Sequence, residues 1–385
     1  MGYYYLLIES DKQLISNRRG ITLIGVSHSS IYFRTREGTI LIYKIFDLLH
    51  AFYSHKNDKE IVDDYVIRLH DDNDGVVNPS KTSIVKSKIT SSADITQEKV
   101  CAEEVLGFSS LAKVCSNSDS LFVLTSKSEL VQLHQSDPNR GHNTILLNKF
   151  DMQQLDTIYI AATDFRCMAI VKNNVLLDNE YKTELYKFRD NVQSFSAGKD
   201  FYVVLLSDGS LWSFGNGLRG QLGLNNLSCQ KIPQQIYVNT EDEDANDEEE
   251  KSIFVSNVYC GGWHVFALTE CHQRIYSWGW NSNGQTGIDD TLRCVQPFPT
   301  ELPKFTEKIT NISLGSRHSS IKLQNGDIFC FGFNKLGQCG QKRSEYVNLA
   351  AISHPSTKNN SLLSNIKHGD IICSGLITIV YFKDL

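Results

Sequence analysis

The 385-residue sequence lacks an apolar run of about 18 residues, the length that a transmembrane helix requires, so no membrane span is expected. Its first residues, from Met1 to Leu6, show neither the basic region nor the small-residue cleavage site of a secretory signal. None of its ten cysteines forms a C-x-x-C pair, and several lie in apolar segments, as reduced thiols do. These absences favour an intracellular protein.

Signatures of catalytic and metal sites are also absent. The sequence contains no G-x-x-x-x-G-K-[ST] nucleotide loop, no H-E-x-x-H and no G-x-S-x-G. Cys260 and His264, with Cys271 and His272 nearby, could suggest zinc, but their spacing does not fit a structural zinc site. We therefore expect no enzyme activity, no cofactor and no metal.

What the sequence does contain is one short pattern in three copies. Each copy has an aromatic residue and a glycine, then a G-Q-x-G turn: Phe214-Gly215 with Gly220-Gln221-Leu222-Gly223, Trp278-Gly279 with Gly284-Gln285-Thr286-Gly287, and Phe331-Gly332 with Gly337-Gln338-Cys339-Gly340. Two apolar runs around a polar turn, such as Asp208-Gly209 or Asn325-Gly326, lead into a copy, which is typical of a β-hairpin. A period of several tens of residues made of short strands predicts an all-β propeller.

A further glycine precedes each expected hairpin, at Ala197-Gly198, at Gly261-Gly262-Trp263-His264 and at Gly315-Ser316-Arg317-His318-Ser319. Glycine at such a position is expected where strands crowd. With the aromatic-Gly step and the G-Q-x-G turn, this entry segment resembles the RCC1-like repeat (regulator of chromosome condensation) family over residues 191–340. When the same residue type recurs at the same position of several repeats, a structural role in blade packing is indicated. We expect such a role for Gly198, Gly262, Gly315, His264 and His318.

Less regular copies extend the repeat in both directions. The clearest contains Gly25 and His28, which we also interpret as structural, and others begin near residues 116, 162 and 374. Together the copies number seven, which predicts a seven-bladed RCC1-like β-propeller formed by residues 1–385 as a single domain. We expect the N-terminal segment 3–8 and the C-terminal segment 371–382 to share one blade, because this closes the ring and hides a strand edge.

Two stretches interrupt the repeats. Residues 48–110 are of mixed charge and are predicted to be a partly disordered insertion, with Asp64–Leu69 as its best strand candidate. Residues 240–251 are predicted to be an acidic disordered loop, because eight acidic side chains between Glu241 and Glu250, with no base among them, repel one another. This tract accounts for the whole net charge of −6. It is either a solubilising loop or a docking strip for histones and other basic proteins, with Glu248, Glu249 and Glu250 as candidate contacts.

The sequence contains no basic stripe or tail, so direct sequence-specific binding of nucleic acid is not expected. Three turns should line one side of the ring: Asn216–Arg219, Asn281–Asn283 and Asn334–Leu336. Arg219, Trp280 and Lys335 are the candidate partner-binding residues on these turns, chosen because Arg and Trp are frequent at interface hot spots. Trp263 lies in a Gly-Trp-His segment similar to a repeated element of light-sensing plant members, but this chain has a single such segment, so light sensing is not expected.

Within the family, residues 192–323 look most like the RCC1 domain-containing protein 1 group. This resemblance implies a non-catalytic interaction scaffold in chromatin regulation and in mitotic spindle organisation and chromosome segregation. It also implies a JmjC-domain oxygenase as partner, and a location in nucleus and cytoplasm with association to chromosomes. Two alternatives stay open: guanine-nucleotide exchange on a Ran-like GTPase, as in the founding member, and partnership in tRNA and diphthamide modification, as in small fungal members.

Overall fold

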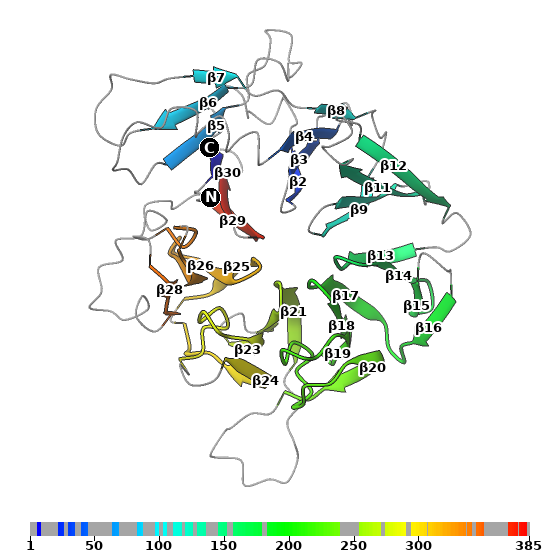
Figure 1. The fold of residues 1–385 in the computed structure, drawn as a ribbon. Helices are drawn as coiled ribbons and strands as arrows, with labels where there is room; N and C mark the ends of the chain where they lie inside the picture. Colours follow the sequence, from blue (N-terminus) through cyan, green and yellow to red (C-terminus); the bar gives the residue numbers. More distant parts are fainter. Residues whose placement is uncertain are drawn as a thin grey trace.

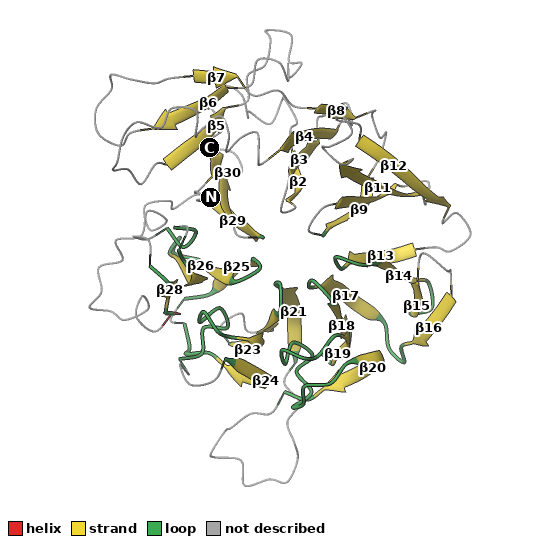
Figure 2. Cartoon of the chain, in the orientation of Figure 1, coloured by secondary structure: helices red, strands yellow, loops and turns green. Residues whose placement is uncertain are grey.

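The structure is a computed structural model. It describes residues 6–8, 22–26, 30–34, 40–44, 64–68, 83–87, 97–99, 103–105, 111–117, 120–125, 129–135, 145–151, 157–178, 183–238, 254–270, 274–289, 294–305, 307–335, 337–340, 344–349, 369–375 and 377–382. In these residues the regular structure consists of β-strands, which form seven sheets arranged radially around a centre (Figures 1 and 2). An all-β propeller fold, as the repeats predicted, is confirmed.

Six sheets are four-stranded antiparallel meanders that follow the chain closely. The first two of these sheets contain β2 (Thr22–Val26), β3 (Ser30–Arg34), β4 (Ile40–Lys44) and β8 (Glu103–Val105), then β9 (Leu111–Ser116), β10 (Ser120–Thr125), β11 (Glu129–Gln135) and β12 (Ile145–Asp151). The third contains β13 (Thr157–Ala162), β14 (Cys167–Val171), β15 (Val175–Asp178) and β16 (Thr183–Lys187).

The other three meanders carry the sequence pattern most clearly. They contain β17 (Val192–Ala197), β18 (Phe201–Leu206), β19 (Leu211–Gly215) and β20 (Gln230–Ile236), then β21 (Val255–Cys260), β22 (His264–Thr269), β23 (Ile275–Trp280) and β24 (Val295–Glu301), and finally β25 (Ile309–Leu314), β26 (His318–Leu323), β27 (Ile328–Phe333) and β28 (Tyr346–Val347). We call these blades F, G and H.

The seventh sheet combines both ends of the chain with part of the 48–110 stretch. Its strand order is β29 (Gly369–Ser374), β30 (Ile377–Phe382), β1 (Leu6–Ile8), β5 (Asp64–Arg68), β6 (Ser83–Ser87) and β7 (Gln97–Lys99). Strand β1 lies parallel to both β30 and β5, with Leu6 opposite Ile379 and Tyr65. The 48–110 stretch thus supplies three strands here and β8 to the first meander, and its other residues lie outside the described part.

The apolar runs form the second strand of each blade. Strands β18 and β22 are buried along their whole length, whereas the outermost strand β20 is half exposed. The cores lie between neighbouring blades, and one of them contains Phe201 and Val203 of blade F with Val265 and Trp278 of blade G. A continuous apolar run is what a strand covered on both faces requires.

The aromatic-Gly step has a steric cause. Gly215 is the last residue of β19, and Gly279 and Gly332 are the last but one of β23 and β27; their φ values of 110°, 106° and 102° lie in a region that L side chains rarely adopt. A Cβ on Gly279 would lie 2.3 Å from the carbonyl oxygen of Trp263, so a side chain has no room there. The step lets the third strand pass close to the loop that joins the first two strands.

The G-Q-x-G turns connect each blade to the next one. The backbone carbonyl of Gln221 accepts a hydrogen bond from Nε1 of Trp278 (3.0 Å), that of Gln285 from Oγ of Ser319 (2.6 Å), and that of Gln338 from Oγ1 of Thr378 (2.8 Å). Each donor belongs to the following sheet. The turn is therefore an inter-blade connection as well as a loop.

Loops between first and second strands join the blades a second time. Backbone N–H groups donate from Asp164 to Lys199 (2.8 Å), from Lys199 to Gly262 (3.1 Å), from Gly262 to Gly315 (3.0 Å) and from Ser316 to Gly375 (2.6 Å). We call these hydrogen-bonded loops the collar, and the side of the ring on which they lie the collar face. The side that carries the β18–β19 turn at Ser207–Ser210 is the hairpin face.

The chain between blades F and G leaves from the hairpin face. Strand β20 runs antiparallel to β19, with Gln230 opposite Gly215 near the collar and Ile236 opposite Leu211 near the hairpin turn. Phe254, where the described chain resumes, lies against Gly209 of that turn, since a Cβ on Gly209 would be 2.8 Å from its ring. The acidic residues Glu241–Glu250 lie outside the described residues, but both of their attachment points are on the hairpin face.

Candidate functional site: a cation–aromatic ladder on the collar face

The structure brings together two of the three predicted partner-binding residues. The guanidinium carbon of Arg219 lies 4.7 Å from the ring centroid of Trp280, although the two residues come from different blades. It lies 4.5 Å from the ring of Trp263 as well. The two indole rings meet edge to face, with their centroids 5.5 Å apart. Arg219 therefore covers a pair of tryptophans.

A second arginine continues the arrangement. The guanidinium of Arg317 lies 5.1 Å from the ring of Trp280 and 5.9 Å from that of Phe333. Cations and aromatic rings thus alternate across blades F, G and H in what we call the ladder, formed by Arg219, Trp263, Trp280, Arg317 and Phe333. The ammonium of Lys199 lies 5.0 Å over the outer ring, Trp263.

The repeat itself places these side chains. Trp263 and Arg317 occupy the same position in the loops of the collar, one residue before the strands that begin at His264 and His318. Trp280 and Phe333 each follow the glycine of an aromatic-Gly step. Because these positions recur on every blade at the same face, side chains from neighbouring blades meet there.

Asp200 holds the Trp263 end of the ladder. Its carboxylate accepts hydrogen bonds from Nε1 of Trp263 (3.1 Å), Nδ2 of Asn216 (3.1 Å) and Nε2 of Gln221 (3.3 Å). Burial raises the pKa of Asp200, while the hydrogen bonds from Trp263 and Gln221 act in the opposite direction. The indole ring is thus fixed by a hydrogen bond as well as by stacking.

The two arginines keep their hydrogen-bonding edges available. Among the described residues, neither the Arg219 nor the Arg317 guanidinium forms a hydrogen bond or an ion pair, although Arg219 is exposed and Arg317 is half-buried. Aromatic rings cover guanidinium faces, and the N–H donors lie in the guanidinium plane. A guanidinium held flat in this way is prepared for bidentate binding of a carboxylate.

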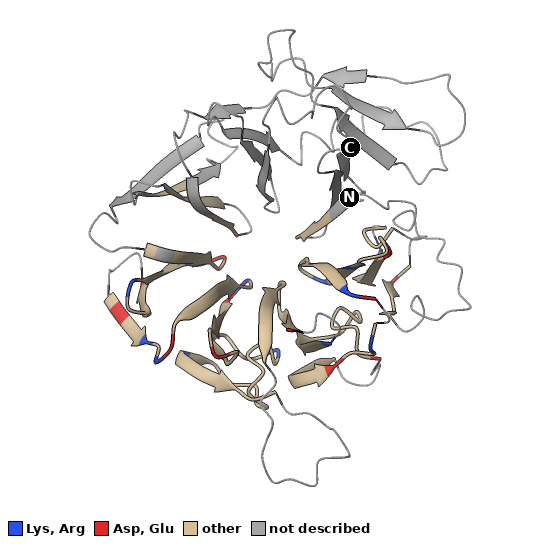
Figure 3. Ribbon diagram, turned by 180° about the vertical axis from the view of Figure 1, so that it is seen from behind, with Lys and Arg blue, Asp and Glu red and all other residues tan. Residues whose placement is uncertain are grey.

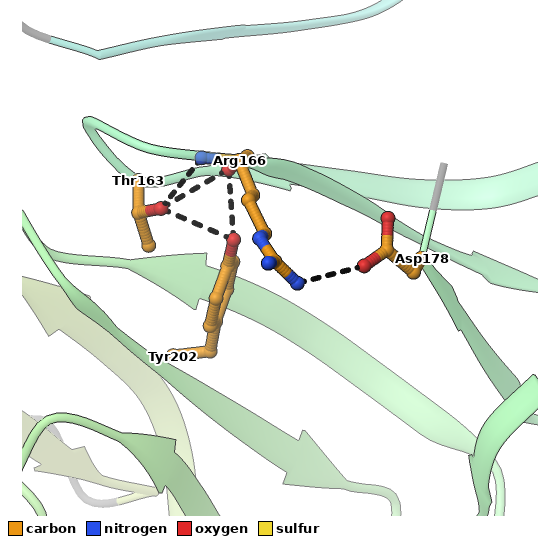
Figure 4. A network of polar contacts seen from close by, with 4 residues as sticks. All are labelled: Thr163, Arg166, Asp178 and Tyr202. Carbon is orange, nitrogen blue, oxygen red and sulfur yellow. Dashed lines mark hydrogen bonds and ion pairs between the residues drawn. The ribbon is translucent and has the colours of Figure 1, made fainter. Parts of the chain in front are cut away.

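An exposed phenylalanine extends the collar face toward the preceding blade. Phe165 occupies the collar position equivalent to Trp263 and is 80% exposed. Its loop is held on several sides, because Oγ1 of Thr163 accepts from the backbone N–H of Arg166 (3.1 Å), Arg166 pairs with buried Asp178 (3.1 Å) and the Tyr202 hydroxyl donates to the Arg166 carbonyl (2.8 Å) (Figure 4). Burial raises the pKa of Tyr202, so its hydroxyl keeps the proton that it donates.

The remaining predicted contacts do not join the ladder. Lys335 is exposed and forms an ion pair with Glu345 at 2.8 Å. Glu248, Glu249 and Glu250 lie outside the described residues, in a segment attached to the hairpin face. Figure 3 shows the Lys and Arg residues of the described part scattered over the blades and not gathered in a stripe.

The residues predicted to be structural lie at the blade contacts. A Cβ on Gly315 would lie 2.3 Å from Cε1 of His318, and one on Gly262 would lie 2.6 Å from the Ser316 carbonyl oxygen. A Cβ on Gly198 would lie 2.0 Å from the ring of Phe201. Gly261, not Gly262, is the repeat equivalent of Gly315. Gly25 lies in β2, and His28 lies outside the described residues.

His264 and His318, two of the histidines predicted to be structural, are buried and take part in inter-blade contacts. Nε2 of His264 lies 2.8 Å from Oγ of Ser319, and Nε2 of His318 lies 2.9 Å from Oγ1 of Thr378. Among the described residues, no three His, Cys, Asp or Glu side chains come close enough to hold a metal ion, and no helix there is long and apolar enough to cross a membrane. Residues 215–220 read G-x-G-x-x-G, but this turn leads into β20 and not into the helix that a dinucleotide site requires.

The sequence did not reveal the ladder as a site. Trp263 and Arg317 were named there as parts of the segment that precedes each hairpin, and Trp263 also for its likeness to light-sensing members, while Phe165 lies in an irregular copy. The available signal was positional, because Trp263 and Arg317 stand directly before the second strands of blades G and H, although Asp200 fills the same position in blade F.

Comparison with known proteins supports the repeat assignment. The family model described as "Regulator of chromosome condensation (RCC1) repeat" matches residues 208–268 and 273–321, and a second model of this repeat matches residues 192–221 and 255–285. The mouse "RCC1 domain-containing protein 1" is 26% identical over 189 residues, covering 40% of this chain and 47% of the relative. The resemblance to RCC1-like repeats and to this group is confirmed.

Two further likenesses concern a plant protein and a solved structure. The Arabidopsis thaliana "Ultraviolet-B receptor UVR8" is 31% identical over 133 residues, covering 34% of this chain and 27% of the receptor. This chain therefore spans less than half of the length of either curated relative. The crystal structure of Prp20p from Saccharomyces cerevisiae superposes with a TM-score of 0.58 at 12% identity, covering 91% of this chain and 80% of Prp20p, which shows the fold alone.

Proposed function

From its RCC1 repeats, we propose that this protein is a non-catalytic interaction scaffold whose collar face binds a protein partner through the ladder. The observation that carries the proposal is the pair of guanidinium groups, Arg219 and Arg317, stacked on aromatic rings and without polar partners in the described chain. Arginines and tryptophans held in this way are the residue types that dominate interface energetics. Stacking also reduces the entropy that each arginine loses on binding.

The ladder favours a partner with carboxylates on a folded surface. Each guanidinium can donate two hydrogen bonds to one carboxylate of the partner. Phe165 presents an exposed apolar ring on the same face, which a pocket on the partner could cover. The hydrogen-bonded loop around Phe165 reduces the conformational entropy that is lost on binding, as stacking does for the two arginines. Binding should therefore depend on several preformed groups and weaken at high salt.

We propose a JmjC-domain oxygenase as the principal partner, with roles in chromatin regulation and in spindle and chromosome segregation. The likeness to RCC1 domain-containing protein 1 of mouse and human supports this choice. A nuclear and cytoplasmic location, with association to chromosomes, belongs to the same proposal. Basic proteins such as histones are proposed to bind the acidic tract at Glu241–Glu250.

Guanine-nucleotide exchange on a Ran-like GTPase is the second candidate function. It is supported by the fold shared with Prp20p, a protein whose structure was described together with its binding to Gsp1p and histones. Partnership in tRNA and diphthamide modification is the third, and it rests on the fold class alone.

We also propose that the seven sheets are the blades of one ring that the two chain ends close. The parallel pairing of β1 with β30 supports closure. So does the packing of first strands in chain order, β2 on β9, β9 on β13, β13 on β17, β17 on β21, β21 on β25 and β25 on β29.

Affinity pulldown from nuclear extract with quantitative mass spectrometry tests the partner and the surface together. We expect the parent protein and Lys335→Ala to recover a JmjC oxygenase, and Arg219→Ala, Trp280→Ala and Arg317→Ala to lose it by about 30-fold or more, as for hot-spot residues. Thermal melting should show each variant folded, because an exposed cation–π contact contributes only about 0.5–1 kcal/mol. Equal recovery with the ladder variants would exclude this surface, and robust exchange on Ran with no oxygenase recovered would establish the second candidate instead.

A further inference from the structure

A groove on the outer rim of the ring has no role in the proposed function. It lies between β20 of blade F and β24 of blade G, has a volume of about 480 Å³, and is lined by Asn225, Gln234, Gln235, Tyr237, Phe298 and Pro299 among others. Among the described residues, none of those that line it is charged. An acidic or basic ligand would find no counter-ion there, so the groove is suited to a neutral ligand.

The apolar part of the groove consists of exposed rings. Tyr237 is 67% exposed and Phe298 is 39% exposed, and Ile232 on the same outer strand is also exposed. Large apolar side chains are normally buried in a soluble protein, and several on one rim indicate a surface that another molecule covers. Together with Pro299, these rings form ridges that could hold flat, apolar side chains.

The polar part of the groove consists of side-chain amides with free donors. Within the described residues, the side chains of Asn225, Gln235 and Tyr237 form no hydrogen bond. Asn225 is held with φ at 56°, a left-handed value, by a hydrogen bond from its backbone N–H to the carbonyl of Pro297 (2.9 Å). The donors at the groove are thus positioned by the link between the two blades and are available to carbonyl acceptors.

The outer strands do not offer an uninterrupted edge for a further β-strand. Pro233 lies within β20, and Pro297 and Pro299 lie within β24. Proline has no N–H to donate, so a ladder of backbone hydrogen bonds cannot run along either strand. An extended peptide in this groove must therefore be held through side chains.

We propose that this groove binds a proline-rich segment of a partner protein in the polyproline II conformation. Such a segment is neutral, its backbone carbonyls point outward without internal partners, and its rings pack on aromatic ridges. The amides of Asn225 and Gln235 and the hydroxyl of Tyr237 would donate to those carbonyls, and Tyr237, Phe298 and Pro299 would contact the proline rings.

Fluorescence polarisation with a labelled ten-residue proline peptide tests this proposal. We expect saturable binding by the full chain, a loss of at least tenfold in affinity for Tyr237→Ala and for Gln235→Ala, and no change for Tyr346→Ala, which alters an exposed tyrosine on another blade. Arg219→Ala should also bind the peptide normally, so that failure of the ladder and failure of the groove are separate results. All variants should melt at the parent temperature.

Four outcomes would overturn the proposal. The first is the absence of saturable binding, and the second is equal binding of a glycine–serine peptide of the same length. The third is unchanged affinity for Tyr237→Ala. Binding of a neutral oligosaccharide such as maltohexaose in place of the peptide would also reject it, because the same amides and rings would then serve a sugar.

Discussion

The hydroxyl group of Ser319 determines the protonation of a buried histidine. Ser319 donates its single proton to the carbonyl of Gln285, so its oxygen can only accept from Nε2 of His264. Nδ1 of His264 then carries a lone pair and has no hydrogen-bond partner in the described chain. The ring packs on Gly261, where a Cβ would lie 2.3 Å from Cε1. We infer from these contacts that the histidine is neutral and packs between blades G and H, the structural role that its repeat position predicts.

Stability should therefore depend on pH through His264. Burial, with a smaller contribution from His318, lowers the pKa of His264 to about 3. In the unfolded chain a histidine binds a proton below about pH 6.5, whereas the folded protein does not bind it until about pH 3. The unfolded state thus holds more protons in this window, and the free energy of unfolding should fall by up to about 1.4 kcal/mol per pH unit as the pH drops.

Urea titrations at pH 7 and pH 5.5 measure this effect above the range where most carboxylates titrate. The parent should lose stability between the two pH values, and His264→Gln should lose less. If the variant and the parent show the same loss, the titration belongs to other groups.

Replacement of His318 or Gly315 should damage folding and not a binding activity. His318→Ala removes the ring that bonds to Oγ1 of Thr378, which keeps only its bond to the Gln338 carbonyl among the inter-blade contacts described above, and should cost about 1–3 kcal/mol. Gly315→Val should cost more than about 1 kcal/mol, because its side chain would collide with the His318 ring. Denaturant unfolding measures both. Full stability of His318→Ala together with loss of partner recovery would show that this residue acts in binding.

At the scale of elements, the sequence specified strands and turns but not the contacts between blades. The turns at Asp208-Gly209 and Asn325-Gly326 were predictable because a tight hairpin turn needs positive φ, which glycine adopts easily. The φ values of 83° and 92° at these glycines confirm the prediction. The stacking of Arg219 on Trp263 and Trp280 was not predictable, because residues from different repeats meet only through the geometry of the ring. Arg219 and Trp280 could be selected by residue type, but their contact could not.

The described residues on either side of the acidic tract lie on the hairpin face, whereas the ladder lies on the collar face, so we expect the two to act independently. Neutralising Glu241–Glu250 by Gln and Asn substitutions should weaken binding of a basic histone-tail peptide, most strongly at low salt, because exposed charges are screened over about 8–10 Å at physiological ionic strength. Recovery of the ladder partner and thermal stability should not change. Titrations of the peptide at two salt concentrations measure the first effect, and unaltered affinity at low salt would leave the tract with a solubilising role.

At the scale of the whole molecule, the collar and the G-Q-x-G turns connect successive blades at two radii. Hydrogen bonds between collar loops act near the centre, and the Gln carbonyls act further out. Trp263 and Arg317 of the ladder belong to the collar loops, and Arg219 comes two residues before Gln221. A partner on the collar face therefore meets a surface assembled from three blades, whose relative positions are fixed before it binds.

The short N-terminal strand should be needed for the stability of the ring. Deletion of residues 1–8 removes β1, exposes the edge of β30 and separates it from β5. We expect the melting temperature to fall by several degrees, since in a large domain each kcal/mol corresponds to roughly 2 °C. Deletion of residues 1–5, which spares β1, is the matched control. Equal melting of both truncations and the parent would exclude closure by the chain ends.

The direction of the Gln carbonyl contacts has a consequence for biosynthesis. Each carbonyl receives its donor from the blade that follows it in the chain, from Trp278, Ser319 or Thr378. A ribosome delivers the earlier blade first, so the carbonyl of a newly emerged blade accepts from water until its successor has left the exit tunnel. We therefore expect the contacts between blades F, G and H to form about one blade behind synthesis. A chain truncated after any of these blades would lack the donor for its last Gln carbonyl. Chaperones and proteases could distinguish such an exposed blade edge from the finished ring.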